Sequence, residues 1–551
     1  MATQTATELQ TLDATPVTRI LTSPKSSHVP AVPIEASAAA VAGGGGGGGG
    51  MTTTTTTTTT TTVLLPRFRA VIVTVQLCGL MFFSSFCNGI VVVALPAMQS
   101  GLGLDEGLLV WPSSSYYLTA GSCLLLAGSI ADAAGAKRVQ LVGSLLAAAF
   151  TLGCGLARTG GELIAFRALQ GVTNAIISPS SISIISSSLE EGRPRNMGFA
   201  CLGFSQPLGF GVGLVLAGVL TDTIGWRPAF YLAAAASLAL FLLSIWALPP
   251  DPRRPEADQP VWRRLALHID WVGLLFASTG LAMLSYVLAS MSSDINNIHQ
   301  APSIVLLVIS GFSIPAFAAW MHYQSKNNRT ALIPNSLWRS RVFTSSCILI
   351  LLTNAITNCM ELYSSLFFQQ VQGISALGAS IRVLPSLLAG VLTSILTGIF
   401  VNRMPVLWTV LISSALSATA PLLMAFIRTD QVYWENAFFG QILSPISCDM
   451  LFTVGLLIIS DVYPKHMQAL GGAVFNTCAQ LGAAVGLSVA QVVASSVTSN
   501  VASSSADKSS PDALMKGYRA AFWLMFGCMV AVCFVSALGL RKVGVIGVKR
   551  D

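Results

Sequence analysis

Two acidic residues, Asp449 and Glu361, lie well inside long apolar stretches of this 551-residue chain, which has 23 acids in all. Placing a charged side chain at the centre of a bilayer costs about 2.5 kcal/mol or more on insertion scales, so an acid there is a candidate for function. A carboxyl group removed from water holds a proton more readily, which suits a reversible proton carrier. The alternative is that each acid pairs with a neighbouring donor and only fixes helix packing.

Arg167 is the basic counterpart of these acids in another apolar stretch. An arginine in effect never loses its proton, so it cannot carry the proton itself. It can keep a carboxylate ionised until substrate or a conformational change separates the two groups. The alternative is an anchor to a neighbouring backbone carbonyl. Arg382 is a weaker candidate, because it lies at the start of its apolar stretch, near the membrane interface, where a long side chain can reach water.

Uncharged polar residues accompany these charges within the apolar stretches. A site for organic molecules is mostly apolar with a few placed polar groups. Hydrogen bonds between helices, worth about 0.6 kcal/mol each, are the competing explanation. The candidates for a substrate cavity are Asn88, Tyr117, Asn174, Gln206, Asn358, Asn476 and Gln480.

The composition requires that these residues be held in a membrane. The chain is 53% hydrophobic and only 10% charged, whereas about a quarter of the residues of a soluble domain are charged. This excludes a cytosolic enzyme, a secreted disulfide scaffold and a globular nucleic-acid binder. The eleven cysteines lie in apolar stretches without any C-x-x-C pair, and the five histidines show no ligand spacing beside them. We therefore predict no metal site and no cofactor.

Long apolar runs alternate with short polar breaks from residue 70 onward. A helix needs about 20 apolar residues to cross the hydrocarbon core, and other open backbone structures are excluded there. The sequence predicts an all-α integral membrane protein with fourteen transmembrane helices. They cover residues 70–98, 108–130, 139–157, 163–185, 198–220, 229–248, 271–290, 303–322, 343–368, 381–401, 406–427, 437–460, 469–497 and 520–540.

The longest connections follow the sixth and the eighth of these helices, which divides the chain into six helices, two inserted helices and six more. A six-plus-six arrangement is typical of transporters built from two pseudo-symmetric halves around a central cavity. The glycine run 43–50 and the threonine run 52–62 cannot bury a core, so the segment that holds them is predicted to be disordered. The predicted segments are a cytosolic tail (1–66), a six-helix bundle (67–250), a linker (251–270), two inserted helices (271–322), a linker (323–342), a second six-helix bundle (343–540) and a cytosolic tail (541–551).

Lysines and arginines near the helix ends are concentrated on one side of the predicted membrane. Basic residues are enriched in cytoplasmic loops, so this side is predicted to be the cytosol. Both termini then lie in the cytosol, which agrees with an even number of helices. A plasma membrane is favoured over a vacuole.

Several short motifs resemble one family of membrane proteins. Gly128 to Arg138 (GSIADAAGAKR) resembles the major facilitator signature between helices two and three, and Leu163 to Gly171 is similar to the second motif on helix four. Gly209, Gly213 and Gly218 fall where the helix-five antiporter motif has glycines. Ala94-Leu95-Pro96 closes the first helix as in the fourteen-helix drug:proton antiporters, and Trp111-Pro112-Ser113-Ser114 and Pro445 to Asp449 are similar to the fungal branch of that group. The resemblance covers roughly residues 70–540.

The chain departs from the family pattern at a few positions. Leu214 replaces the proline beside the helix-five glycine, and Ala217 replaces a later glycine. Cys87 stands where helix one often carries an acid, and Ala133 and Ala136 replace common basic residues. These departures concern the coupling ion and the direction of transport rather than the fold.

The resemblance implies a major facilitator fold and roles for three sets of residues. It gives Arg167 a part in proton coupling. It makes Gly128, Asp132, Gly135, Lys137 and Arg138 a cytosolic gate, in which Asp132 is expected near a helix amino terminus, where the dipole favours it. The cations are expected to pair with the opposite half or only to fix the orientation of the loop.

The third set lies on helix five. Small residues at intervals of four let two helix backbones approach closely, and Pro207 can bend the helix just before them. Packing alone explains Gly209 and Gly213. The resemblance adds that tight closure around Gly209, Gly213 and Gly218 prevents leakage of ions.

These features together predict a proton-coupled secondary transporter that exports small organic compounds across a fungal membrane by alternating access. Its partners would be the small-molecule substrate, protons and the lipid bilayer, and it would act as a monomer without nucleic acid. Three alternatives stay open. They are an importer or uniporter of a small nutrient such as ammonium, a membrane sensor that does not translocate, and an integral-membrane enzyme, for which we find no nucleophile–base pair.

Overall fold

The computed structural model describes residues 66–190, 192–251, 270–293, 298–327, 333, 337–400, 403–463, 465–501, 510–541 and 544. Most of the predicted tails and linkers (1–66, 251–270, 323–342 and 541–551) lie outside these described residues. Regular structure in the described part is helical throughout, so the predicted all-α class is confirmed.

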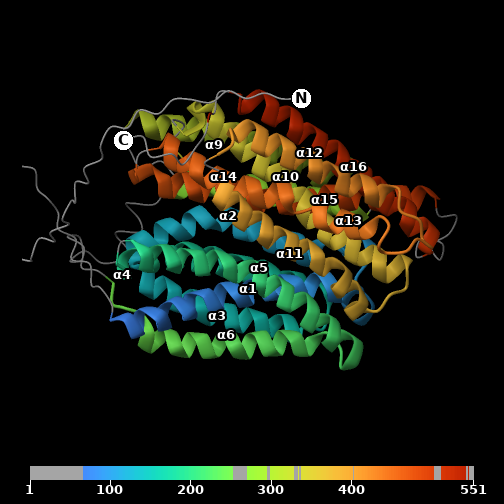
Figure 1. Cartoon of the computed structure of the whole chain (residues 1–551), viewed down its shortest axis with the longest axis horizontal. Coiled ribbons are helices and arrows are strands. Elements are labelled where there is room, and N and C mark those ends of the chain that lie inside the picture. Colours follow the sequence, from blue (N-terminus) through green and yellow to red (C-terminus); the bar gives the residue numbers. More distant parts are fainter. Residues whose placement is uncertain are drawn as a thin grey trace, which may run out of the picture. The chain divides into compact units, whose positions relative to one another are not determined.

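Figure 1 shows the order of the helices along the chain. The first six are α1 (Arg67–Leu102), α2 (Trp111–Ala134), α3 (Ala136–Leu156), α4 (Gly160–Ser188), α5 (Arg193–Thr223) and α6 (Arg227–Ala247). The next two are α8 (Trp271–Ser293) and α9 (Ala301–Lys326). The last seven are α10 (Arg341–Leu366), α11 (Ala376–Phe400), α12 (Val406–Ala425), α13 (Ala437–Leu443), α14 (Ile446–Val462), α15 (Lys465–Val501) and α16 (Pro511–Gly539).

Polar residues and glycines mark several of the helix ends. The Thr159 hydroxyl accepts a hydrogen bond from the backbone N–H of Glu162 at the start of α4, and Ser340 and Ser510 cap α10 and α16 in the same way. A side chain before the first turn satisfies amides that have no partner inside the helix. Gly103 ends α1 with φ +62°, a conformation that favours glycine.

Twelve helical segments in the described residues are long and apolar enough to cross a membrane, with α13 and α14 counted as one. Helices α4 and α8 occupy two further predicted crossings but are not among the twelve. Helix α4 contains Arg167, Asn174 and several serines, which lower its hydropathy. The count of fourteen crossings therefore stays a prediction.

The predicted continuous helix 437–460 is wrong in one respect, because it is broken in its first third. Helix α13 ends at Leu443 and α14 begins at Ile446, with Ser444 and Pro445 between them. Proline has no N–H for the helix ladder and its ring clashes with the preceding turn. The break places Asp449 in the first turn of α14.

The helices form two groups. Helices α1–α6 pack on one another and α10–α16 pack on one another, and the groups meet where α2 contacts α15 and where α5 contacts α11 (Figure 1). Helix α8 pairs with α9 and also contacts α2 and α15. We call α1–α6 the first group and α10–α16 the second group. We call the end of the molecule at which α1 begins the near end, and the end at which α1 stops the far end.

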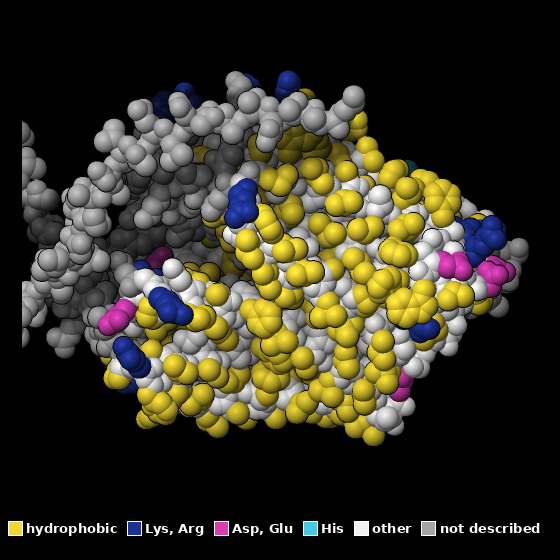
Figure 2. All heavy atoms as spheres, viewed as in Figure 1, with side chains coloured by type: hydrophobic (Ala, Val, Ile, Leu, Met, Phe, Trp, Pro, Cys, Tyr) yellow, Lys and Arg dark blue, Asp and Glu magenta, His cyan; other side chains and the backbone are white. Residues whose placement is uncertain are grey.

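Side chains on the outer surface agree with a surrounding membrane. On the visible face, hydrophobic side chains cover the middle, whereas Lys, Arg, Asp and Glu gather toward the two ends (Figure 2). Large apolar side chains such as Phe312 and Leu388 are exposed to more than half of their surface, at 71% and 63%. Soluble monomers rarely expose apolar patches of this extent.

Candidate functional site

Asp449 and Glu361 project from α14 and α10 of the second group. Both side chains are half-buried, and the two carboxyl groups lie close enough to interact electrostatically. In the described part of the chain, neither carboxyl accepts a hydrogen bond from a side chain or an amide. Because no described hydrogen-bond donor occupies these two carboxyl groups, they can bind a proton or a cation.

Asn354 of α10 links the helices around these acids. Its side-chain amide donates a hydrogen bond of 2.6 Å to the backbone oxygen of Ala479 on α15. Asn358, one turn later, donates to the backbone oxygen of Asn354 at 2.8 Å. Cys448, the neighbour of Asp449, donates from Sγ to Asn354 Oδ1 at 3.7 Å. Asn354 is not among the candidates predicted from the sequence, although its spacing of four residues from Asn358 is a signal for it.

Tyr117, Asn476 and Gln480 come from helices that face each other across the two groups. Tyr117 of α2 lies within electrostatic range of both Glu361 and Arg167. Gln480 of α15 packs beside Gly121 of α2, where an added Cβ would meet Gln480 Cβ at 3.1 Å. The Gln480 side-chain oxygen is buried and has no hydrogen-bond partner among the described residues. Asn476, one turn earlier, is half-buried. These three candidates therefore lie at the junction of the groups, near the acids.

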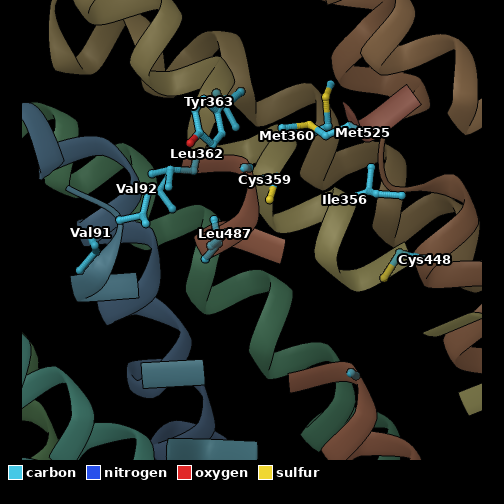
Figure 3. Packing of buried hydrophobic residues seen from close by; sticks show 14 of the residues in the cluster. Val91, Val92, Ile356, Cys359, Met360, Leu362, Tyr363, Cys448, Leu487 and Met525 are labelled. Carbon is cyan, nitrogen blue, oxygen red and sulfur yellow. The ribbon is translucent and has the colours of Figure 1, made fainter. Parts of the chain in front are cut away.

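An apolar cluster lies on the far side of the acids. Val91 and Val92 of α1 are buried together with Leu362 and Tyr363 of α10, and Figure 3 shows Val92 beside Leu362. These apolar residues of α10 directly follow Glu361 in the direction of the far end.

Arg167 lies in a cage of neutral polar groups within the first group. Its side chain is fully buried, and its Nε donates to the backbone oxygen of Pro112 at 2.9 Å. One terminal nitrogen donates to Gln170 at 2.8 Å and the other to Asn88 at 2.5 Å. The guanidinium also lies over the Tyr116 ring, 4.6 Å from its centre, an arrangement that favours a cation.

Among the described residues, Arg167 therefore makes no hydrogen bond to a carboxylate in this conformation. All of its hydrogen bonds in the described part of the chain end on neutral oxygens. A buried charge is tolerated when hydrogen bonds replace its water, and the cage supplies them. The predicted cavity residue Asn88 is a ligand of this arginine and is itself buried.

The cage continues into a small polar cavity in the first group. Gln170 donates to the Thr151 hydroxyl at 2.7 Å, and Ser84 bonds to the Tyr116 hydroxyl at 2.9 Å and to Asn174 at 3.2 Å. Ser84, Tyr116, Thr151 and Gln170 are among the residues that line a cavity of about 20 Å³, which is room for about one water. Asn174 therefore belongs to this network.

The predicted gate residues lie around the turn between α2 and α3 at the near end, where Lys137 bonds to residues that follow α6. The Lys137 backbone N–H donates to Asp251 at 2.8 Å and its ammonium donates to the backbone oxygen of Leu248 at 2.8 Å. Gly135 has φ +101°, and a Cβ there would overlap the Asp251 carboxyl. Asp251 is not among the candidates predicted from the sequence, because it stands at the start of a predicted linker.

Asp132 lies between two helix ends. It is in the last turn of α2, which ends at Ala134, and α3 begins shortly after it at Ala136. A carboxylate at a helix carboxyl terminus meets the negative end of the dipole. Asp132 and Arg138 are exposed, and Gly128 is half-buried on α2 with the Pro179 ring near it.

The glycines of α5 allow close contact with two different helices, α1 and α11. A Cβ added at Gly209 or Gly213 would overlap the backbone of α1, at Phe82 and Phe86. A Cβ added at Gly218 would instead meet α11 of the second group. The predicted close approach is thus made twice, once within the first group and once between the groups.

Gln206 and Pro207 precede these glycines on α5. Pro207 lies within the helix. Gln206 is exposed although it lies on the opposite side of the helix from Phe204 and Leu208, two exposed apolar side chains of α5. Solvent therefore reaches Gln206 on the side of α5 that faces away from Phe204 and Leu208.

Hydrogen bonds between the two groups are concentrated in the far half. Gln369 donates to the backbone oxygen of Val93 at 2.9 Å, and Ser380 donates to that of Leu214 at 2.9 Å. Further bonds join Ser114 to Ser488, Ser365 to Val92, and Asp222 to Ala376 and Leu377. In this conformation the groups are therefore joined at the far end.

A family model described as Major Facilitator Superfamily matches residues 77–427 and 383–546. The chain belongs to this superfamily. The resemblance drawn from the short motifs is thereby confirmed, and the chain is a multi-pass membrane transporter of small molecules.

Relatives within the superfamily include fungal proteins. The chain is 38% identical to "MFS-type transporter 1" of Pyricularia oryzae over 525 residues, which are 88% of this chain and 85% of that one. It is 26% identical to "Efflux pump terJ" of Aspergillus terreus, over 82% of this chain and 84% of that one. It is 25% identical to "Low affinity ammonium transporter" of Saccharomyces cerevisiae, over 79% of this chain and 81% of that one.

A solved structure shares the superfamily fold. A bacterial homologue of the human lysosomal transporter Spinster, in an inward-facing unoccupied conformation, aligns with TM-score 0.61 and 13% identity. The alignment covers 87% of this chain and 98% of that one.

Proposed function

We propose that this superfamily member is a proton-coupled exporter of small organic compounds that works by alternating access. The observation that carries the proposal is the pair of half-buried carboxyl groups, Glu361 and Asp449, to which no described donor is bonded. Two carboxylates in range of each other repel, and a proton or a cation held between them relieves the repulsion. Protons and substrate would therefore compete for the same groups.

Arg167 would act on this pair without contacting it. Its charge is permanent, and the neutral cage does not cancel it. Tyr117 lies within range of both Arg167 and Glu361, so the field of the arginine reaches the junction of the groups. A fixed positive charge in the first group favours ionised carboxyls in the second group when the groups approach.

The direction follows from the proposed orientation. We place the near end and both termini in the cytosol, in the plasma membrane, with the protein as a monomer. The closed far end then faces the exterior, and the exposed Gln206 lies on the cytosolic path. This is the state in which an exporter takes up its cargo. The relative named as an efflux pump supports the same direction.

Vesicles with an imposed pH gradient test the proposal. The probe is ethidium, a fluorescent organic cation, loaded on the cytosolic side of vesicles that contain the purified protein. Gradient-driven efflux is expected for the natural protein and is expected to fall at least tenfold in Asp449→Asn and Glu361→Gln. The matched control is Asp430→Asn, which changes an exposed acid at the far end. Full gradient-driven transport by Asp449→Asn would refute its coupling role.

Uptake or facilitated passage of a small cation is the second candidate. It is favoured by the relative named as an ammonium transporter and by Leu214, which replaces the family's proline beside the helix-five glycine. Uptake of radiolabelled methylammonium down its own concentration gradient that does not require a pH gradient would support this candidate. Ethidium efflux that requires a pH gradient would support the exporter.

A further inference from the structure

Asp222 joins the two groups at the far end through the backbone of α11. It lies in the last turn of α5, in the first group. Its Oδ1 accepts a hydrogen bond of 3.0 Å from the backbone N–H of Ala376, and its Oδ2 accepts one of 2.9 Å from Leu377. Both amides belong to the first turn of α11, in the second group.

The chemistry of a helix start explains why a carboxylate suits this place. The first amides of a helix have no acceptor inside the helix, and they carry the positive end of its dipole. A carboxylate that receives two of them makes charge-assisted bonds, which are stronger than neutral ones. Asp222 therefore completes a helix that belongs to the other half of the molecule.

Ser375 satisfies the remaining amides of the same turn. Its hydroxyl accepts from Gly378 at 3.2 Å and its backbone oxygen accepts from Ala379 at 2.9 Å. The start of α11 thus has two kinds of acceptor. Ser375 lies in the chain that leads into α11 and moves with it, whereas Asp222 lies across the junction.

The surroundings make the Asp222 contact sensitive to separation of the groups. The Ser380 hydroxyl donates to the backbone oxygen of Leu214 at 2.9 Å, and a Cβ added at Gly218 would overlap Ser380. Helices α5 and α11 therefore lie in close contact here. Asp222 is itself exposed, so water can replace its carboxylate as soon as the helices part.

We propose that Asp222 is a far-end latch, a positioning residue that holds α11 against α5 and sets the share of molecules closed at the far end. The proposal rests on the alternating access of the proposed function. When the far end opens, the amides of Ala376 and Leu377 exchange a carboxylate for water, whereas those bonded to Ser375 keep their acceptor. Each bond that exists only in the closed state shifts the balance toward it.

Three variants isolate the latch. Asp222→Ala removes both acceptors, and Asp222→Asn keeps one oxygen without the charge. Ser375→Ala is the matched control, because it removes a cap from the same turn of the same helix without touching α5. Asp222 and its neighbour Thr223 are exposed, so all variants are expected to fold, which their thermal unfolding and elution in detergent will check.

The distance between the groups at the far end is the measurement. Spin labels are attached to non-natural amino acids in place of Arg158 and Asp430, which are exposed far-end residues of the first and the second group. Pulsed electron resonance on the full chain in nanodiscs then gives the distance distribution. The short distance should dominate in the parent. The ratio of long to short distances should rise about tenfold in Asp222→Ala, less in Asp222→Asn, and not at all in Ser375→Ala.

Two outcomes would overturn the latch. One is an unchanged distribution in Asp222→Ala, and the other is an equal shift in Ser375→Ala. The distances report the conformation and not the movement of protons, so the Asp449→Asn transport assay is a separate test of the proposed function. A long distance that appears in Asp222→Ala while Asp449→Asn transports normally would support the latch and refute the coupling role.

Discussion

Gly390 of α11 lies directly against the carboxyl group of Asp449 of α14. A Cβ added at Gly390 would overlap Asp449 Oδ2, whereas the next atoms, Asp449 Cγ and Pro445 Cβ, would lie at 3.4 and 3.5 Å. The space for the carboxyl is therefore bounded by the backbone of α11, the helix that also receives Asp222 at the far end. A shift of α11 would change the surroundings of Asp449.

Gly390→Ala should displace the Asp449 carboxyl and leave the fold intact. The new methyl group overlaps only the end of a side chain that can rotate. Groups that act on a proton or ligand must be held within about half an ångström of their working geometry. We expect gradient-driven ethidium efflux to fall about tenfold and its pH profile to change.

Gly398→Ala is the control for this change. It makes the same substitution two turns later on α11, where nothing lies within 4 Å of the added Cβ. It should transport like the natural protein. Equal transport by both variants would show that the position of the Asp449 carboxyl has no part in coupling.

Arg167→Lys should destabilise the protein although it keeps the charge. The guanidinium reaches Asn88, Pro112 and Gln170 from three nitrogens at once, and a single ammonium cannot reproduce this planar fork. At least one buried oxygen then loses its donor, which costs about 1–3 kcal/mol. The midpoint of thermal unfolding in detergent should fall by several degrees.

Arg138→Lys is the matched control, since Arg138 is exposed at the near end. Its unfolding midpoint should stay within a degree of the parent. An Arg167→Lys protein with an unchanged midpoint would mean that the cage does not depend on the shape of the guanidinium.

Gly213→Ala should loosen the contact between α1 and α5. The added methyl overlaps the Phe86 backbone, which cannot rotate away, and overpacking of this kind costs about 1–3 kcal/mol. Gly203→Ala on the same helix meets nothing within 4 Å. It should be neutral or slightly stabilising, because alanine favours the helix more than glycine does. Thermal unfolding of the two variants measures the difference, and equal midpoints would argue against close packing at Gly213.

The helical class and the buried charges could be predicted from the sequence because each depends on local composition. Asp449, Glu361 and Arg167 stand out as charges among apolar neighbours. Asp222 and Gly390 do not, because their partners, Ala376 and Asp449, lie far away along the chain. Their importance arises only when the helices come together.

The prolines show the same limit of prediction from local sequence, here within single helices. Pro445 separates α13 from α14, whereas Pro96, Pro179 and Pro207 lie inside continuous helices. In transmembrane helices, neighbouring groups can satisfy the backbone that a proline leaves open. Here the Ser417 hydroxyl accepts from the Ser447 backbone N–H at 2.9 Å just after the break. Whether a proline breaks its helix thus depends on partners that the local sequence does not reveal.

Asn354 and Asn358 offer a test that separates helix packing from substrate binding. Asn354 donates to the backbone of α15 at 2.6 Å, whereas within the described part of the chain Asn358 donates only to Asn354 in its own helix. Asn354→Ala should therefore loosen α10 from α15 and cost about 1 kcal/mol, seen as a lower unfolding midpoint. Asn358→Ala should keep the midpoint and change the ethidium concentration that gives half-maximal efflux, because its half-buried side chain lies one turn from Glu361. If Asn358→Ala lowers the midpoint as much as Asn354→Ala and leaves that concentration unchanged, Asn358 is a packing residue and does not belong to the substrate cavity.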